Sequence, residues 1–288
     1  MEALRNFWNH LPAAIDPVFF HLGPLSIRYY GLMYIVALGV VYGLVLHRLK
    51  HEDFSCSKET IQSFFLWAVV AMLIGGRLGY VFFYDWKFFS AHPLKIFLPL
   101  DFSPEFRISG LQGMSYHGGV IAILLSSALF SFRHRISFWR LSDLLCPAIP
   151  LGYTFGRIGN FLNGELYGRV TALPWGMYFP EDTTRQLRHP SQLYEAFFEG
   201  IFLFLLLWRL RRTPALRGHF LGLYLIGYGA VRFFIEFTRQ PDPQLGLVLG
   251  PFSMGQVLCG GMILAGALLI AGRRSPGKTQ SPSKGLPS

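Results

Sequence analysis

The sequence has little charge and few cysteines, and each shortage excludes a class of protein. Only 15% of the 288 residues are charged, whereas soluble domains average about 25%. The three cysteines, Cys56, Cys146 and Cys259, have no C-x-x-C or other metal-like spacing, so neither a disulfide framework nor a zinc site is expected. The motifs G-x-S-x-G, H-E-x-x-H and the P-loop are missing. A serine hydrolase, a zinc protease and a nucleotide-driven pump therefore have no support.

Long apolar segments dominate instead, since 52% of the residues are hydrophobic. A helix that crosses the hydrocarbon core needs about 20 mostly apolar residues. We predict an all-α membrane protein whose single polytopic domain, residues 1–272, contains seven transmembrane helices. Their approximate ranges are 26–46, 61–84, 114–132, 141–161, 194–208, 220–237 and 253–272. We expect a small outer loop domain at 162–193, a disordered cytoplasmic tail at 273–288 and no removable signal peptide.

The basic residues predict the orientation of these spans. The net charge is +10, but in a membrane protein the position of the positive charge matters more than its sum. The connections after the first, third, fifth and seventh spans are rich in Lys and Arg, whereas the alternate connections are longer and more acidic. By the positive-inside rule, the N-terminus is outside and the C-terminus is cytoplasmic. No basic patch lies on a soluble domain, so nucleic-acid binding is not expected.

Polar residues gather near the outer ends of six predicted spans. A charge at the centre of a membrane helix costs about 2.5–3.5 kcal/mol on insertion scales, and such residues usually face the bundle interior or a wet cavity. Arginines at this depth need anions. Glu165, Glu195, Glu199 and Glu236 can supply some of them, and a bound phosphate could supply another. The polar residues in question are Tyr30, Arg77, His117, Arg157, Asn160, Asn163, Glu165, Glu195, Tyr228, Arg232 and Glu236.

The residue types alone leave both structural and functional interpretations open. His117 is either a general base or a structural histidine at a helix start. Asn160 and Asn163 either orient a head group or cap a helix, and Tyr30 and Tyr228 are either site residues or interfacial aromatics. At this point an enzyme that acts on phospholipids, a transporter or flippase of a phosphorylated lipid, and a non-catalytic subunit all remain possible.

One stretch distinguishes among these classes. Residues 156–168, G-R-I-G-N-F-L-N-G-E-L-Y-G, resemble the signature of the prolipoprotein diacylglyceryl transferase family. Further segments resemble the family in the same order, and the resemblance covers about residues 16–272. These segments are YYGLMY (29–34), GGRLGYVFFY (75–84), GMSYHGG (113–119), RHPSQLYEAFFEG (188–200), GYGAVRFFIEFTRQPD (227–242) and SMGQ (253–256).

The resemblance implies a seven-span protein of the bacterial inner membrane, with its active site toward the outer leaflet. Such a protein transfers the sn-1,2-diacylglyceryl group of phosphatidylglycerol to the lipobox cysteine of a prolipoprotein, forms a thioether and releases sn-glycerol 1-phosphate. The implied partners are phosphatidylglycerol, prolipoprotein signal peptides that carry the lipobox cysteine, and membrane lipids. No metal or diffusible cofactor is implied, and we expect a monomer.

The resemblance also implies roles for individual residues. Arg157 matches an essential arginine that binds the lipid phosphate, and Arg232 matches a second one near the reacting bond. His117 matches a histidine proposed as the base for the thiol; a tyrosine, a carboxylate or an arginine-stabilised thiolate are the alternatives. The predicted catalytic residues are His117, Arg232 and Tyr228; the lipid-binding residues are Arg157, Tyr30, Asn160 and Arg77; the polar network is Asn163, Glu165, Gly168, Glu195 and Glu236.

One segment departs from the family pattern. Only residues 181–188 separate PWGMYFP from RHPSQLYE, whereas some family members carry a much longer insertion there. Contacts to a lipoprotein substrate through that insertion are therefore not predicted for this chain, while the core of the site is unaffected.

Overall fold

A computed structural model of the protein describes residues 2–23, 25–96, 100–101, 107–108, 113–240 and 247–273. The chain divides into two compact units. Unit 1 comprises residues 1–47 and 142–288, and unit 2 comprises residues 48–141. Each unit is described here by itself. Apart from Arg273, the predicted tail at 273–288 lies outside the described residues.

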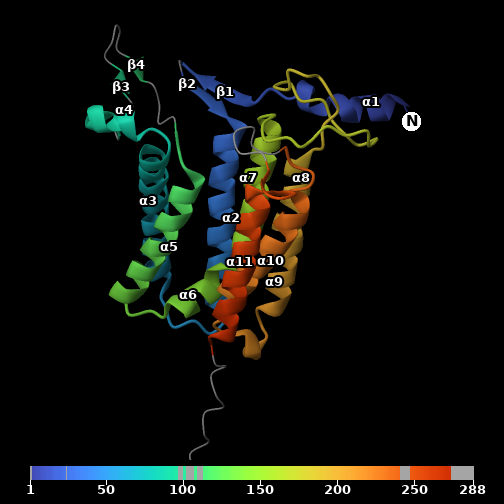
Figure 1. Ribbon diagram of the computed structural model, residues 1–288. Helices are drawn as coiled ribbons and strands as arrows, with labels where there is room; N and C mark the ends of the chain where they lie inside the picture. The colour runs from blue at the N-terminus through green and yellow to red at the C-terminus, as the bar shows by residue number, and fades with distance from the viewer. Residues whose placement is uncertain are drawn as a thin grey trace, which may run out of the picture. The chain divides into compact units, whose positions relative to one another are not determined.

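Unit 1 holds most of the helices (Figure 1). Its elements before the unit boundary are α1 (Glu2–His10), the 3₁₀ turn η1 (Leu11–Ala14), β1 (Val18–Leu22), β2 (Leu25–Arg28) and most of α2 (Tyr29–His51). After the boundary, which falls within α6 (Phe138–Leu145), they are α7 (Ile149–Leu162), α8 (Ser191–Glu195), the π-helical turn η3 (Ala196–Phe202), α9 (Leu203–Leu210), the 3₁₀ turn η4 (Pro214–Leu216), α10 (Phe220–Ile235), β5 (Leu247–Leu249), β6 (Phe252–Ser253) and α11 (Met254–Ala271).

Unit 2 is built on two long helices. Its elements are α3 (Lys58–Phe83), α4 (Trp86–Ala91), the 3₁₀ turn η2 (Pro93–Ile96), β3 (Leu100–Asp101), β4 (Arg107–Ile108) and α5 (Tyr116–Arg133). Helices α3 and α5 approach closely through glycine. A Cβ atom added to Gly75 would lie 2.7 Å from the carbonyl oxygen of Gly118, and one added to Gly79 would lie 2.7 Å from Gly118 Cα. The glycines on either side of Arg77 therefore allow close packing of these two helices.

The described residues are mostly helical, as predicted for a helical membrane protein. Within them, four helices are long and apolar enough to cross a membrane, namely α2, α3, α5 and α11. The spans predicted at 141–161 and 194–208 fall on helices that are interrupted or change type, and the one at 220–237 falls on the shorter α10. A multi-pass membrane protein follows from these helices, while the count of seven stays a prediction.

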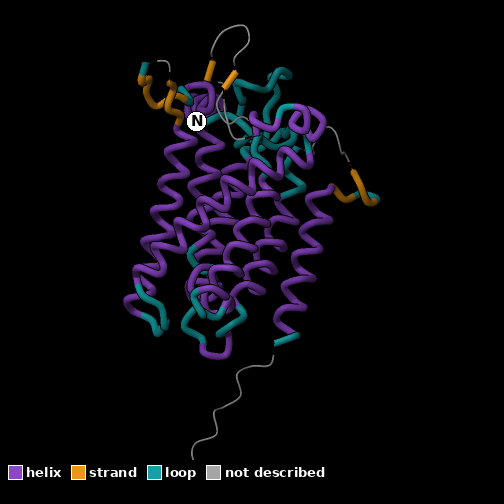
Figure 2. The backbone as a smooth tube through the Cα atoms, turned by 90° about the vertical axis from the view of Figure 1, so that its left-hand side faces the viewer, coloured by secondary structure: helices purple, strands orange, loops and turns teal. Residues whose placement is uncertain are grey.

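The structure adds short strands that the helical prediction did not include. Each described sheet is an antiparallel pair, β1–β2, β3–β4 or β5–β6. Figure 2 shows the strands in orange, as short pieces between much longer helices. The β1–β2 hairpin leads directly into α2, and β6 leads directly into α11. Arg28, predicted at the start of the first span, consequently ends a strand.

Helix packing in unit 1 positions the polar residues of the site. Gly200 of η3 lies against α7 so closely that an added Cβ would meet Thr154, whose hydroxyl donates to the carbonyl oxygen of Ala196 at 3.1 Å. Helix α11 begins with a capping box formed by Ser253 and Gln256, which satisfies amide groups at the helix start. The Ser253 hydroxyl also donates to Glu236 Oε1 at 3.1 Å, so the start of α11 is tied to the end of α10.

The segment between α7 and α8, residues 163–190, folds around a small apolar cluster. Phe161, Met177 and Phe179 are buried in it, with Tyr167 and Leu193 packed against them. The N-terminal helix α1 joins this segment through backbone and side-chain hydrogen bonds, including one from the Tyr178 amide to the Asn9 carbonyl at 2.8 Å. The segment therefore packs on an apolar cluster that it shares with α7 and α8, and its assignment as an outer loop domain stays a prediction.

The segment contains a buried ion pair between Arg188 and Asp182. Arg188 Nε donates to Asp182 Oδ2 at 2.7 Å and Arg188 Nη2 to Asp182 Oδ1 at 3.0 Å, and both side chains are buried. These hydrogen bonds from Arg188 hold the pKa of the Asp182 carboxyl well below its usual range. This bidentate ion pair, here called the Asp182–Arg188 clamp, joins two residues of the short loop at 181–188.

This clamp predicts a pH-dependent stability. Because the pKa of Asp182 is lower in the folded protein, the pair stabilises the fold above the ordinary aspartate pKa of about 4 and loses that contribution as the pH falls below it. Asp182→Asn should cost about 3–5 kcal/mol of stability at neutral pH, since it leaves the buried Arg188 charge without its anionic partner. It should also flatten the fall in melting temperature between pH 6 and pH 3. Glu181→Gln, at the exposed neighbouring position, is the control, and equal acid sensitivity in wild type and Asp182→Asn would contradict the assignment.

Candidate functional site

Helix α7 supplies the first part of a buried polar cluster in unit 1. Tyr153, Arg157 and Asn160 follow one another at spacings of four and three residues, which places them on one face of the helix. Arg157 Nε donates to the Tyr153 hydroxyl at 2.6 Å, and Arg157 Nη1 donates to Asn160 Oδ1 at 3.2 Å. The Arg157 guanidinium also lies 4.7 Å from the centroid of the Tyr153 ring. Its orientation is thus fixed by its own helix.

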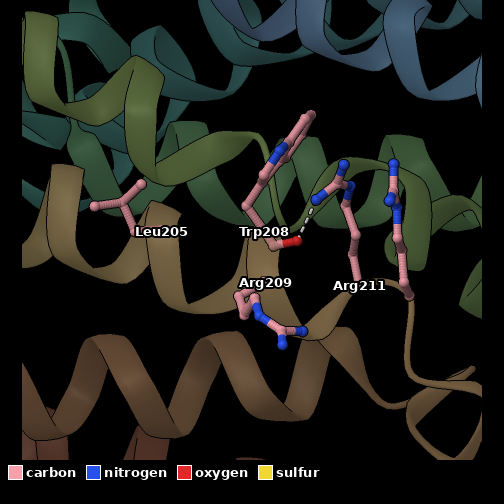
Figure 3. Close-up of a pocket in the computed structure, with 5 residues that line it drawn as sticks. Leu205, Trp208, Arg209 and Arg211 are labelled. Atoms are coloured by element: carbon pink, nitrogen blue, oxygen red, sulfur yellow. Dashed lines mark hydrogen bonds between the residues drawn. The ribbon is translucent and has the colours of Figure 1, made fainter.

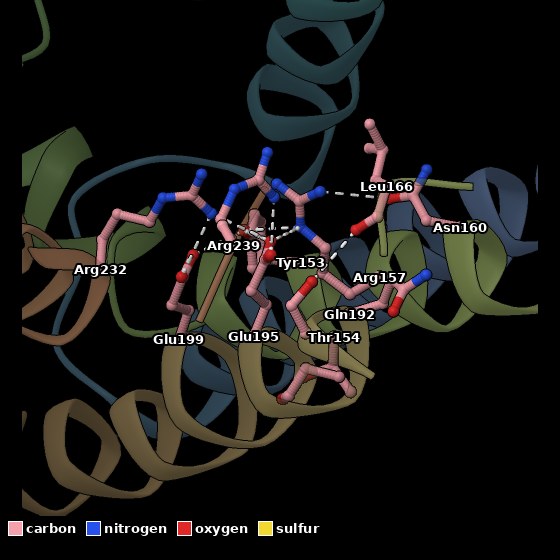
Figure 4. A network of polar contacts seen from close by, with 12 residues as sticks. Tyr153, Thr154, Arg157, Asn160, Leu166, Gln192, Glu195, Glu199, Arg232 and Arg239 are labelled. Atoms are coloured by element: carbon pink, nitrogen blue, oxygen red, sulfur yellow. Dashed lines mark hydrogen bonds and ion pairs between the residues drawn. The ribbon is translucent and has the colours of Figure 1, made fainter. Parts of the chain in front are cut away.

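Glu195 is the centre of the cluster. Its side chain has no exposed surface, and its carboxylate contacts three guanidinium groups (Figure 4). Oε2 lies 2.8 Å from Arg157 Nε and 3.0 Å from Arg232 Nη1, while Oε1 accepts from Arg239 Nη1 at 2.7 Å. A single carboxylate at the start of η3 therefore joins α7, α10 and the segment that follows α10.

Glu199, one helical turn later, forms a second link. The Tyr153 hydroxyl donates to Glu199 Oε2 at 2.6 Å, and Arg232 Nη1 donates to Glu199 Oε1 at 3.4 Å. Tyr153 thereby connects the Arg157 guanidinium to Glu199 through a single hydroxyl. A change at any one of these side chains disturbs the others, because such networks are coupled.

Charges in the cluster are balanced by number. Arg157, Arg232 and Arg239 face Glu195, Glu199 and Glu236. Glu236 Oε2 lies 3.2 Å from Arg232 Nη2 and 3.4 Å from Arg239 Nε. Burying charge costs free energy unless each ion is paired, and removing one partner of a buried pair costs about 3–5 kcal/mol. The three carboxylates therefore hold the three guanidinium groups in fixed positions.

Glu165 extends the network from the turn that follows α7. Its Oε1 accepts from Asn160 Nδ2 at 2.8 Å, and Asn163 Nδ2 lies 3.5 Å from the same oxygen. The Glu165 carbonyl accepts from Gln192 Nε2 at 2.6 Å. Asn163 Oδ1 and Gln192 Oε1 are buried and have no hydrogen-bond partner in the described part of the chain. Two buried acceptors near Glu165 therefore lack a donor among the described residues.

Gly168 lies where three segments meet, and only glycine fits there. Its amide donates to the His189 carbonyl at 2.8 Å, and it pairs with Arg239 as an antiparallel β-bridge. An added Cβ would fall 2.7 Å from His189 Cβ and would also collide with the Thr238 carbonyl oxygen. Gly168 thus allows the backbone that carries Arg239 to reach the cluster.

The predicted tyrosines border the cluster. The Tyr228 ring on α10 meets the Tyr153 ring edge-on, with centroids 5.8 Å apart. Tyr30 on α2 donates to the Tyr34 hydroxyl at 3.0 Å, and it lies beside Gly159, where an added Cβ would be 3.4 Å from Tyr30 Cα. Helix α2 therefore contacts the turn of α7 that holds Arg157 and Asn160.

His117 and Arg77 belong to unit 2. His117 is the second residue of α5, two positions after the N-cap Ser115, and its side chain is exposed. Arg77 is buried and donates to backbone carbonyls of Ile96, Gly113 and Lys95 at 2.6, 3.2 and 2.8 Å. Within unit 2 it therefore holds the chain that follows α3, and its lipid-binding role stays a prediction.

The sequence prediction named many residues of this cluster but not all of the contacts between them. It named Glu165, Glu195, Glu199 and Glu236 as possible anions for the arginines. In the structure Glu195 pairs with Arg157, and Glu236 pairs with Arg232. Tyr153 was not predicted, although its spacing of four residues from Arg157 was a usable signal. Arg239 was not predicted either, although its spacing of three residues from Glu236 and seven from Arg232 was a usable signal; in the structure it follows the end of α10. Among the described residues, no group of His, Cys, Asp or Glu is arranged to hold a metal ion.

The helices and the buried arginine–glutamate cluster define a polytopic membrane protein with a fixed polar site. A family model described as prolipoprotein diacylglyceryl transferase matches residues 17–271. A phosphatidylglycerol–prolipoprotein diacylglyceryl transferase from Chlorobaculum tepidum is 52% identical over 260 residues, covering 90% of each chain. Proteins of the same name from Wolinella succinogenes and Bordetella avium are 46% and 45% identical, covering 87% and 84% of this chain and 90% and 89% of those relatives. The chain belongs to the prolipoprotein diacylglyceryl transferase family.

Proposed function

We propose that the protein transfers the diacylglyceryl group of phosphatidylglycerol to the lipobox cysteine thiol of a prolipoprotein. The observation that carries this proposal is the convergence of Arg157 and Arg232, both in family motifs, on the buried Glu195. The relatives at 45–52% identity are named for the same activity. That name favours a transferase over the transporter that the sequence alone left open.

The proposed reaction is a substitution at carbon. The thiolate sulfur attacks the glyceryl carbon that bears the phosphate ester, the carbon–oxygen bond breaks, and a thioether forms. The electron pair of the broken bond leaves with sn-glycerol 1-phosphate, whose phosphate gains negative charge. Guanidinium groups held in place before the reaction stabilise such charge without reorganisation. Arg157 and Arg232, fixed by the carboxylates and by Tyr153, are suited to that role.

The thiol must lose its proton before it attacks. A nearby positive charge lowers a cysteine pKa from its ordinary value of about 8.5, and we propose His117 as the base, since an imidazole side chain can serve as a general base. Tyr228, which contacts Tyr153, is proposed to act in the same step. The substrate thiol belongs to another protein, so none of the enzyme's three cysteines is required.

The free acceptors beside Glu165 support a choice of head group. Phosphatidylglycerol carries two glycerol hydroxyls, which are hydrogen-bond donors. We propose that Asn163 Oδ1 and Gln192 Oε1, buried and without partners in the described chain, accept from these hydroxyls while Arg157 binds the phosphate, with Tyr30, Asn160 and Arg77 completing the lipid site. A lipid without those donors would leave the acceptors unsatisfied, which costs about 1–3 kcal/mol per group.

The proposed topology follows the distribution of basic residues. We propose seven spans in one polytopic domain, with the N-terminus periplasmic, the cluster toward the outer leaflet of the bacterial inner membrane, and the C-terminus cytoplasmic. The substrates at that face are phosphatidylglycerol and the signal peptides of prolipoproteins with a lipobox cysteine. We propose that the protein acts as a monomer without a metal or diffusible cofactor.

The first test is a reconstituted transfer reaction. The protein is placed in vesicles with acyl-labelled phosphatidylglycerol and a lipobox peptide, and the peptide mass is measured. We expect a gain of one diacylglyceryl group, and none on a peptide whose lipobox cysteine is replaced by serine. Movement of lipid between leaflets without peptide modification would overturn the proposal in favour of a transporter.

Tyr153→Phe tests the network behind Arg157. The change removes the hydroxyl that accepts from Arg157 and donates to Glu199 but keeps the ring. We expect transfer to fall about tenfold in kcat/KM, because a lost hydrogen bond to a charged group is worth about 1.5–3 kcal/mol. Tyr178→Phe, in the segment between α7 and α8, is the control. Unchanged transfer in Tyr153→Phe would remove Tyr153 from the site.

A further inference from the structure

A hollow lies at the C-terminal end of α9, distant from the arginine–glutamate cluster. Its volume is about 410 Å³, and Leu205, Trp208, Arg209, Arg211 and Arg212 line it. Figure 3 shows Trp208 and Arg211 beside each other, with Leu205 and Arg209 on the same helix. Glu195 and Trp208 lie 13 positions apart on one continuous helical run, which corresponds to about 20 Å along the helix.

Arg211 and Trp208 form the rigid part of this hollow. The Arg211 guanidinium stacks 3.9 Å from the centroid of the Trp208 ring and donates to the Trp208 carbonyl. The rings of Phe204 and His47 in turn contact Trp208, at centroid distances of 5.1 and 6.3 Å. One guanidinium is therefore held in a fixed orientation by an aromatic wall.

Arg209 and Arg212 supply further positive charge. Both side chains are exposed, and neither forms an ion pair with an acidic residue in the described ranges. Arginine near a helix C-terminus also stabilises the free carbonyls there, and Arg211 already serves the Trp208 carbonyl. Two exposed arginines thus line the hollow without an acidic partner in the described ranges.

A stripe of exposed apolar side chains lies along the same side of the helix as Arg209. Phe198, Phe202 and Leu205 are 46%, 48% and 57% exposed, and their spacings of four and three residues, with Arg209 four residues further on, place them along one side of the helix. The stripe from Phe198 to Arg209 is about 16 Å long. A soluble anion would use the arginines alone, whereas a phospholipid would use both the arginines and the stripe.

We propose that this hollow binds the phosphate of an anionic glycerophospholipid, with one acyl chain along Phe198, Phe202 and Leu205. Arg209 and Arg212 contact the phosphate, and the Trp208–Arg211 pair forms the wall. In the proposed orientation the lipid belongs to the cytoplasmic leaflet, so it is distinct from the substrate at the cluster. Basic pockets of membrane proteins on this side of the bilayer take anionic head groups.

The test measures lipid binding to the intact protein in detergent by native mass spectrometry, with phosphatidic acid as the probe. We expect Arg209→Gln/Arg212→Gln to weaken its binding about tenfold, and the matched pair Arg133→Gln/Arg135→Gln to weaken it about twofold or less. Arg133 and Arg135 are also exposed arginines, so both pairs remove the same charge. Because the cluster is intact in both variants, the difference between them isolates this hollow.

Further measurements decide the kind of ligand. Phosphatidylcholine should bind more weakly than phosphatidic acid and should not distinguish the two variants. Equal weakening of phosphatidic acid by both pairs would overturn the proposal, because general surface charge would then explain the binding. Full competition by inorganic phosphate at millimolar concentration would also overturn it in favour of a free-anion site.

The result is independent of the proposed transfer reaction. Arg209→Gln/Arg212→Gln should keep the diacylglyceryl transfer of the wild type, measured with the lipobox peptide. An absence of transfer in wild type and both variants would contradict the proposed function but would leave the lipid-binding difference standing.

Discussion

Replacing Arg157 with alanine is expected to lower diacylglyceryl transfer by at least about 100-fold, the usual effect of removing one donor to a charge that develops in the transition state. The side chain is 16% exposed, which is enough to reach a bound phosphate, while Tyr153, Asn160 and Glu195 fix its orientation. Arg157→Lys should recover little activity, because an ammonium lacks the bidentate fork. The measurement is the initial rate of peptide modification.

A loss of fold would give the same loss of activity, so stability must be measured in parallel. Glu195 keeps Arg232 and Arg239 as partners in Arg157→Ala, and we therefore expect the protein to remain folded. Arg133→Ala, at an exposed position of unit 2, controls for a general effect of removing charge. A folded Arg157→Ala that transfers at the rate of the wild type would exclude Arg157 from the reaction.

Gly168→Ala is expected to abolish transfer and to lower the melting temperature. The added Cβ would meet His189 Cβ at 2.7 Å and the Thr238 carbonyl oxygen more closely still, so backbone must move. Overpacking of this kind costs about 1–3 kcal/mol, occasionally more. The displaced backbone forms an isolated β-bridge with Arg239, whose guanidinium contacts Glu195, so the damage extends to the cluster.

Gly156 provides a matched comparison for stability within the same signature. An added Cβ at Gly156 meets nothing within 4 Å, and alanine in a helix interior is about 0.5–1 kcal/mol more favourable than glycine. Gly156→Ala should therefore keep or raise the melting temperature. If Gly168→Ala melted at the same temperature as Gly156→Ala, the close approach at Gly168 would not be needed for the fold.

The sequence predicted the helices and the presence of the cluster, because both depend on local patterns. Long apolar runs determine α2, α3, α5 and α11, and charged residues inside such runs stand out on sequence alone. Which of the four candidate glutamates pairs with Arg157 could not be predicted in this way. Glu195 is distant in the sequence, and only the packing of η3 against α7, through Thr154 and Gly200, brings the two side chains together.

Other features could not be predicted, because the hydrophobic and charge patterns of the sequence contain no clear signal for them. The hairpins before α2 and α11 are short and lie at helix ends, where the hydrophobic signal is weak. The clamp between Asp182 and Arg188 joins residues of a loop that the sequence marked only as short. The Trp208–Arg211 stack lies in a basic stretch that charge counting assigned to the general cytoplasmic belt.

The π-helical turn η3 sets the angle between the two ends of the helix that runs from Ser191 to Leu210. A π turn contains an extra residue compared with an α turn, so each of its residues turns the chain by less than the about 100° of an α-helical residue. If the same residues, Ala196–Phe202, were wound as an α-helix, Glu195 would turn about the helix axis relative to α9. Its carboxylate would then leave the position in which it contacts the three arginines. The angular phase between the two ends of this helix, as well as the identity of its residues, is therefore part of the site.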